Sequence, residues 1–308
     1  MLSRTASELY WMARYLERAE NTARILDVTN KLSLMPLRAD HRTDLQVPLN
    51  ISGTQALFDA NYPQLSMANL LDFFALSNLN HSSIFSCMQM AWNNAHAVRG
   101  SLSSEVWEAI NASWIEMKLI RRKGVAAVGA DAFFDWVKER SHLFRGATFG
   151  TLLRNDALHF IRLGTLLERA DSTARLLSAK ERLLHDNDPV REYYRMETLL
   201  RAVSAREAYH SLYKQQYTRE AIAELLILRD ELPRSLLACV SDMMAQLAQI
   251  DGPQGNPARR QIHALHAELQ FSTLEDVLAP GLDGWLTQFL SQLSGIADSI
   301  HLTYLEAQ

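Results

Sequence analysis

The amino-acid sequence predicts an all-α protein, a helical bundle in which one unit occurs twice. Two observations lead to this fold class. Long stretches, among them residues 65–99 and 192–232, contain neither Gly nor Pro, so they suit helices and carry few β-turn signals. A nine-residue segment also recurs at a distance close to half of the 308 residues of the chain.

The recurring segment reads LERAENTAR at residues 16–24 and LERADSTAR at residues 167–175. Seven of the nine positions are identical, and the shift between the copies is 151 residues. Self-similarity at a fixed spacing is the sequence signature of a repeat architecture. We therefore expect a tandem duplication, with one repeat over residues 1–145, a second over 146–308, and a pseudo-two-fold axis between them.

A second, weaker correspondence lies further along each predicted repeat. At a shift of 152 residues, Ser83 and Cys87 align with Ser235 and Cys239. Both cysteines have apolar neighbours and no basic group fixed beside them in the sequence, so we expect buried, reduced and inert thiols.

The two helices that carry the repeated segment are predicted to be buried on more than one side. The first has an apolar stripe at helical spacing, and it also places Trp11 and Ile25 opposite that stripe. Charged groups inside a helical core must be paired, because each unpaired buried charge costs several kcal/mol. The charged residues concerned are Arg14, Glu17, Arg18, Arg24, Glu168, Arg169 and Arg175.

Two interpretations of these Glu-Arg pairs stay open. In the first, they are interhelical ion pairs that fix how the helices pack. In the second, they bind a zwitterionic ligand, with Arg for its carboxylate and Glu for its amine. A long segment, residues 35–63, contains three Pro and one Gly. We expect it to be irregular, and loops of such length are often functional, so it is a candidate lid.

A metal-dependent enzyme of the di-iron type is the alternative from another class. Its Glu-x-x-His spacing occurs at Glu139 with His142 and at Glu207 with His210. The two pairs do not lie at equivalent places in the predicted repeats, so we expect no metal. We also expect no other cofactor, because no glycine-rich phosphate loop is present.

Composition excludes further classes of function. The net charge of −4 and the pI near 6.2 lack the basic character of a nucleic-acid-binding protein. No apolar run approaches the roughly 18 residues of a membrane span, and the start of the chain lacks the features of a signal peptide. We therefore expect a cytoplasmic protein.

The chain resembles the alpha-E family of helical proteins, which is named for a Glu-Arg motif. The resemblance rests on residues 2–24, 97–100, 107–111, 207–209 and 232–235 in that order. Secondary candidate site residues in the shared or repeated segments are Arg99, Arg234, Ser83 and Ser235. The chain departs from the family where it has Trp92, Asn93 and His96 instead of charged residues, which puts a binding role of the first half in doubt.

The resemblance implies partners more than a reaction. Members of the family look like partners of circularly permuted ATP-grasp ligases and of transglutaminase-like proteins, in peptide synthesis or modification. No independent activity is implied for the helical protein. It would be an accessory or substrate-presenting subunit with an amino-acid or peptide ligand, and a pure interaction scaffold is a further alternative.

Overall fold

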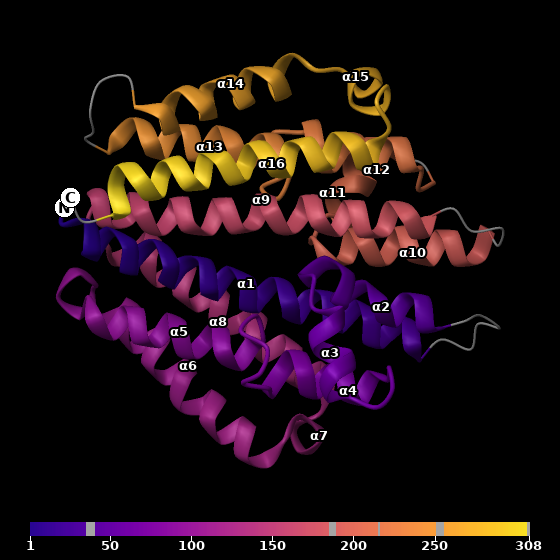
Figure 1. Ribbon diagram of the computed structural model, residues 1–308, viewed down its shortest axis with the longest axis horizontal. Helices are drawn as coiled ribbons and strands as arrows, with labels where there is room; N and C mark the ends of the chain where they lie inside the picture. The colour runs from indigo at the N-terminus through magenta and orange to yellow at the C-terminus, as the bar shows by residue number, and fades with distance from the viewer. Residues whose placement is uncertain (35–40, 185–188, 215, 251–255, 307–308) are drawn as a thin grey trace. The chain divides into compact units, whose positions relative to one another are not determined.

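A computed structural model describes residues 1–34, 41–184, 189–214, 216–250 and 256–306 (Figure 1). Over these residues every regular element is a helix and no β-strand is found. The predicted all-α fold class is therefore confirmed. The chain divides into two compact units, Met1–Thr165 and Leu166–Gln308. A boundary between compact units is not a boundary between sequence repeats, so the repeats 1–145 and 146–308 stay a prediction.

The first unit is built around α1 (Ser3–Ser33), which packs against α5, α8 and α2. The other helices of this unit are α2 (His41–Ser52), α3 (Gln55–Asn61), α4 (Met67–Leu71), the π-helix η1 (Asp72–Leu76), α5 (Ile84–Ala97), the 3-10 helix η2 (Arg99–Ser101), α6 (Ser104–Lys123), α7 (Val125–Val128) and α8 (Ala130–Thr151). Ala19, Ala23 and Leu26 of α1 join an apolar core with Phe73 and Phe133. The central position of α1 explains why its sequence is apolar on more than one side.

The chain then enters α9 (Asp156–Leu184), whose first ten residues belong to the first unit. Gly164 lies so close to α1 that a Cβ atom there would collide with the main-chain carbonyl oxygen of Tyr10 and lie 3.3 Å from the Cβ atom of Ala13. Glycine is therefore the residue that lets these two helices approach each other.

One local prediction is wrong. The segment 35–63 was expected to be irregular, but its described part forms α2 and α3, while residues 35–40 lie outside the described residues. Buried Val47 and Leu49 anchor α2 to the core despite Pro48 in its interior, so burial outweighs the proline signal. The lid interpretation therefore loses its basis over α2 and α3.

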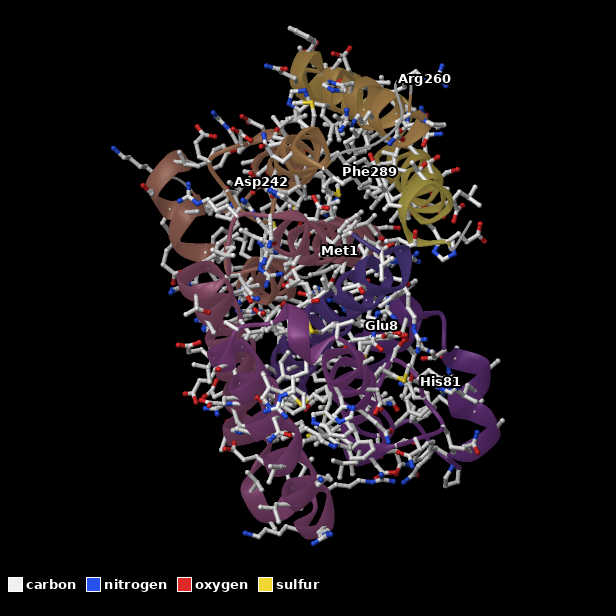
Figure 2. All side chains as sticks on the ribbon, turned by 90° about the vertical axis from the view of Figure 1, so that its left-hand side faces the viewer. Met1, Glu8, His81, Asp242, Arg260 and Phe289 are labelled. Carbon is white, nitrogen blue, oxygen red and sulfur yellow. The ribbon has the colours of Figure 1, made fainter. Side chains whose placement is uncertain are left out.

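The second unit continues α9 and adds seven α-helices and one π-helix among the described residues. They are α10 (Pro189–Ala202), α11 (Arg206–Tyr213), α12 (Arg219–Leu228), α13 (Leu236–Gln249), α14 (Pro257–Phe271), α15 (Leu274–Leu278), α16 (Leu282–Ile300) and the π-helix η3 (His301–Leu305). Helix α14 packs against both α13 and α16, and α12 packs against α13 (Figure 1). Phe289 of α16, labelled in Figure 2, is buried and stacks on Trp285.

Helices α5 and α13 begin with the same local structure. The hydroxyl of Ser83 accepts a hydrogen bond from the main-chain N–H of Ser86 at 3.1 Å, and that of Ser235 accepts one from Ala238 at 3.0 Å. The serine side chains therefore serve as N-caps. This match supports the register of the predicted repeat, while the pseudo-two-fold axis stays a prediction.

The two cysteines complete the correspondence between these helices. Cys87 and Cys239 are fully buried, so their predicted burial is confirmed. The thiol of Cys87 donates to the carbonyl of His81 at 3.9 Å, and that of Cys239 donates to the carbonyl of Pro233 at 3.7 Å. Each thiol therefore contacts the turn that precedes its own helix.

Candidate functional site

Helix α1 turns two carboxylates toward α8. The guanidinium of Arg145 donates through Nη1 to Glu17 Oε2 at 3.1 Å and also to Glu20 Oε2. Glu20 Oε2 accepts a further hydrogen bond from Ser141 Oγ at 2.6 Å, and Glu20 Oε1 accepts one from Arg24 Nε at 2.8 Å. We call this set, Glu17, Glu20, Arg24, Ser141 and Arg145, the α1–α8 network.

The α1–α8 network has the properties of a structural ion-pair cluster. Glu17 and Glu20 are buried, and their two negative charges face the two positive charges of Arg24 and Arg145. Removing one member of such a buried cluster leaves another charge without its counter-charge in a medium of low polarity, which typically lowers the free energy of unfolding by about 3–5 kcal/mol. The arrangement favours the ion-pair interpretation for Glu17.

One turn further along, a second set of charges joins the same helices. Lys138 of α8 lies 3.1 Å from Asp27 Oδ2 and 2.7 Å from Asp135 Oδ1. Burial pulls the pKa of Lys138 down, but the hydrogen bonds and charges of Asp135 and Asp27 outweigh burial and raise it. The hydrogen bond from Lys138 in turn lowers the pKa of Asp135. Charge pairing between α1 and α8 therefore extends over several turns.

A pocket of about 430 Å³ opens on a different face of α1. Its lining comes from α1, from the turn before α5 and from α5 itself. The described residues that line it are Tyr15, Arg18, Asn78, His81, Ser86, Gln89 and Met90. His81, labelled in Figure 2, is exposed, and the guanidinium carbon of Arg18 lies 5.8 Å from the centre of the Tyr15 ring. We call this space the Arg18 pocket.

Glu17 and Arg18 of the first motif therefore lie in different surroundings. Glu17 contacts Arg145 of α8, whereas Arg18 lines the Arg18 pocket beside α5. Consecutive helical residues point about 100° apart, so this division follows from the geometry of the helix. Among the described residues, the lining of this pocket includes Arg18 but not Glu17.

The remaining candidates of the first unit are dispersed. Arg14 lies over the rings of Trp11, at 4.8 Å, and Tyr10, at 5.7 Å. Arg99 is exposed and lies 4.9 Å from the ring centre of Trp107, and Ser83 is the N-cap of α5. These contacts are with neighbouring aromatic rings and with the first turn of α5.

In the second unit the Glu-Arg motif has different surroundings. Glu168 is buried, and Arg169 Nη1 donates to the carbonyl of Pro233 at 3.5 Å. Arg175 pairs with Asp171 at 2.7 Å across one turn of α9, with side chains 48% and 26% exposed. Two further contacts lie in the same region. Thr173 Oγ1 donates to the carbonyl of the buried Arg234, and Ser235 caps α13.

The Glu-x-x-His pairs lie on exposed helix surfaces. Glu139, His142, Glu207 and His210 are all exposed, and His210 contacts the hydroxyl of Tyr217 at 2.9 Å. Within the described residues no group of three or more potential metal ligands of the His, Cys, Asp and Glu types is found. The contacts observed for these pairs do not favour the di-iron alternative.

Two of the residues at which the chain departs from the family, Trp92 and His96, contribute to an aromatic cluster. The indole N–H of Trp92 donates to Asn111 Oδ1 at 2.9 Å, and its ring stacks on His96 with centroids 5.3 Å apart. Trp92 also stacks against Trp114, whereas Asn93 is exposed. Aromatic contacts and one hydrogen bond therefore occupy the place where charges were expected.

Sequence reasoning missed three of the five residues of the α1–α8 network. Glu20 carries a signal in hindsight, since it lies three residues after Glu17 and four before Arg24, on one helix face. Ser141 and Arg145 carry none, because only the tertiary contact between α1 and α8 brings them to the carboxylates.

The first comparison with known proteins concerns families. A family model described as "Alpha-E: A predicted alpha-helical domain with a conserved ER motif" matches residues 1–305. Across the described parts of the chain, no helix combines the length and the apolar character needed to cross a membrane. No solved structure matches the chain.

Individual relatives include uncharacterised proteins from Mycobacterium bovis and from two strains of Mycobacterium tuberculosis. Each is 24% identical over 330 aligned positions, which cover 98% of this chain. The chain spans only 37% of the length of these relatives. Because the family match extends over nearly every residue, the chain belongs to the Alpha-E family.

Proposed function

We propose that this chain is a substrate-presenting accessory subunit of an ATP-grasp-linked system that ligates or modifies amino acids or peptides. The observation that carries the proposal is the Arg18 pocket, a ligand-sized space beside the Glu-Arg helix of an Alpha-E protein. The α1–α8 network would hold that helix in place while the pocket receives a ligand.

The division of labour in the proposal follows from the chemistry of ligation. An ATP-grasp enzyme activates a carboxylate as an acyl phosphate and transfers it to an amine. This chain contains no glycine-rich phosphate loop, so the proposal assigns ATP to the partner and one substrate to the helical subunit. It places the reaction in the cytoplasm, where ATP is supplied.

Two lines of support concern partners. The family resemblance links such proteins with circularly permuted ATP-grasp ligases and transglutaminase-like proteins. The mycobacterial relatives are also much longer than the region they share with this chain, which accords with an Alpha-E region that works beside other domains. A pure interaction scaffold is the alternative, and the structural use of Glu17 favours it over a second catalytic centre.

The experiment is a reconstituted ligation assay. A circularly permuted ATP-grasp protein from the same genome is incubated with ATP and a mixture of amino acids, with and without this chain. We expect more ligated product by mass spectrometry when the chain is present, and no ADP release by the chain alone. Equal product formation without the chain, or ATP hydrolysis by the isolated chain, would contradict the proposal.

A further inference from the structure

We infer that the solvent-facing side of α6 binds an acidic segment of a partner protein, a segment that also carries apolar side chains. The binding surface is a stripe of four exposed residues, Ile115, Lys118, Leu119 and Arg122, which we call the α6 stripe. The inference goes beyond the proposed function, because it concerns contact with another protein and requires no ligation reaction.

The four residues of the α6 stripe form one continuous surface. They lie three, four and seven residues after Ile115, and residues at these spacings share one face of an α-helix. The buried residues of the helix, among them Ile110 and Met117, lie on another face, and α6 packs against α5 and α8. The stripe is therefore the side of α6 that its own unit leaves uncovered.

Two large apolar side chains of the α6 stripe are exposed to solvent. Ile115 is 48% exposed and Leu119 is 49% exposed, and the two lie one helical turn apart. A single exposed apolar residue is common on protein surfaces. An adjacent apolar pair with charges beside it has the make-up of a protein interface, which combines an apolar centre with a polar rim.

The charges beside this apolar pair are basic and lack counter-charges. Four of the six residues 118–123 are Lys or Arg. In the part of the chain that the structure describes, none of their side chains forms an ion pair or a hydrogen bond. Lys118 lies over the ring of Trp114 at 5.5 Å and Arg121 over that of Phe85 at 4.0 Å, contacts that do not neutralise the positive charge.

The basic residues of the neighbouring helix α8 provide a contrast. Lys138, Arg140 and Arg145 each lie within ion-pair distance of a carboxylate of their own unit. The end of α6 therefore concentrates positive charge that the unit itself does not balance, on a chain whose net charge is −4. Such a patch attracts and orients a partner surface of the opposite charge.

The helix dipole explains only part of this pattern. Basic residues in the last turn stabilise a helix, and α6 has three of them there. Lys118 lies before the last turn, where the dipole has little effect. The dipole also gives no reason for the exposed Ile115 and Leu119, whereas a docked segment with apolar side chains would cover both.

Other negatively charged partners fit this face less well. Proteins that bind single-stranded nucleic acid stack bases on aromatic rings, but Trp114 is buried and already stacks on Trp92. A helix that lies in a membrane surface needs a broad apolar face, whereas the α6 stripe has two apolar side chains and Glu108 is exposed on the same side. An acidic protein segment matches both the charge and the apolar pair.

The test is binding of a fluorescently labelled peptide to the purified full chain, followed by fluorescence anisotropy. The probe is an amphipathic peptide of about 16 residues built from Glu and Leu, long enough to form a helix. The matched probe has Ser in place of every Leu. We expect the Glu–Leu peptide to bind at least about tenfold more tightly than the Glu–Ser peptide, because the latter lacks the apolar contact.

The variants test both parts of the surface. Arg122→Gln removes one charge and Leu119→Gln one apolar side chain, and glutamine keeps the helix propensity of both positions high. Each should weaken binding of the Glu–Leu peptide at least about fivefold, with the helix content unchanged by circular dichroism. Arg260→Gln and Phe271→Gln, at exposed positions of α14, are the matched controls and should bind like the unmodified chain.

Several results would overturn the inference. They are absent binding of the Glu–Leu peptide, equal binding of the Glu–Ser peptide, and unchanged affinity in either Arg122→Gln or Leu119→Gln. Tighter binding of single-stranded oligothymidylate, or of phosphatidylcholine vesicles that contain phosphatidylserine, would also overturn it. The assay contains no ligase, so its failure leaves the proposed function in place, and failure of the ligation assay leaves this inference in place.

Discussion

The two Glu-Arg helices carry almost the same nine residues, yet the charged residue that follows each motif lies in different surroundings. On α1, Glu20 is fully buried and accepts hydrogen bonds from Arg24, Ser141 and Arg145. On α9, the aligned Asp171 is 26% exposed and pairs with Arg175 on its own helix. The different burial of Glu20 and Asp171 indicates that the neighbouring helix, more than the motif itself, decides whether a charged side chain forms a buried ion pair.

The arginines of the two motifs differ in a corresponding way. Arg18 lines a pocket, whereas Arg169 donates to a main-chain carbonyl. A duplicated motif can thus keep its sequence while one copy faces a ligand-sized space and the other holds a turn.

The largest expected effect is on Glu20. Glu20→Gln keeps the shape of the side chain but removes its buried charge, so the partly buried Arg24 and Arg145 lose a counter-charge. We expect the free energy of unfolding to fall by about 3 kcal/mol. The aligned Asp171→Asn should cost less than about 0.5 kcal/mol, because exposed pairs contribute little. Urea denaturation of both variants measures the contrast, and equal losses would refute it.

A double-mutant cycle tests whether Glu20 and Arg145 act as one unit. Arg145→Gln alone leaves two buried carboxylates with one cationic partner fewer. Combined with Glu20→Gln, its cost should fall short of the sum of the single losses by about 1–3 kcal/mol, as for residues in one network. Strict additivity in the same urea titrations would show that the two side chains do not interact.

Some of this arrangement follows from the sequence, and the reasons are physical. The all-α class and burial of both cysteines could be predicted, because Gly and Pro are sparse and Cys87 and Cys239 lie in apolar runs. The apolar residues around Glu17 likewise indicated a buried helix. These features depend on local composition and helical periodicity, which one sequence displays directly.

The site was only partly predictable, because it depends on contacts between distant segments. Arg145 lies 128 residues from Glu17, and no local pattern connects them. Pairing Glu17 with Arg18 looked plausible from their adjacency, but neighbours in a helix point to different faces. Burial of Val47 and Leu49 similarly turned a proline-containing segment into α2, a tertiary effect that outweighs local propensity.

The N-caps of α5 and α13 should respond alike, in contrast to the charged residues. Ser83→Ala and Ser235→Ala each remove the cap hydrogen bond to the first turn of a helix, so each should cost at least about 1 kcal/mol. Ser83→Ala also removes the hydrogen bond that Ser83 Oγ donates to the carbonyl of Ser77 at 2.7 Å. Thermal melts with matched Ser→Thr variants as controls would check this. A loss at one site only would argue that the correspondence between the two helices is superficial.

The smallest expected effect concerns two tyrosines, one in each unit, at alkaline pH. Burial, with the hydrogen bond and charge of Asp72, raises the pKa of Tyr62 to about 12. Burial also raises the pKa of Tyr213, but Arg229 opposes it, so Tyr62 should ionise last of the two. Its folded pKa exceeds that of the unfolded chain, so its contribution to stability is present below pH of about 10 and lost toward about 12.

Ultraviolet titration of phenolate absorbance measures this order. Tyr62→Phe should remove a late-ionising component and flatten the loss of stability above pH of about 10. Tyr213→Phe serves as the matched control and should leave that late component in place. Persistence of the late component in Tyr62→Phe would show that another tyrosine is responsible.

The central claim is that Glu17 is a structural partner of Arg145 between α1 and α8, and one paired measurement tests it most directly. Urea denaturation and stimulation of the ligase are recorded on Glu17→Gln and on the unmodified chain. We predict that Glu17→Gln loses on the order of 2 kcal/mol of stability, because Arg145 loses a buried hydrogen-bond acceptor, yet stimulates the ligase normally while it is folded. Unchanged stability with loss of ligase stimulation would contradict the account, because it would show that Glu17 acts on a ligand and not on the packing of the helix.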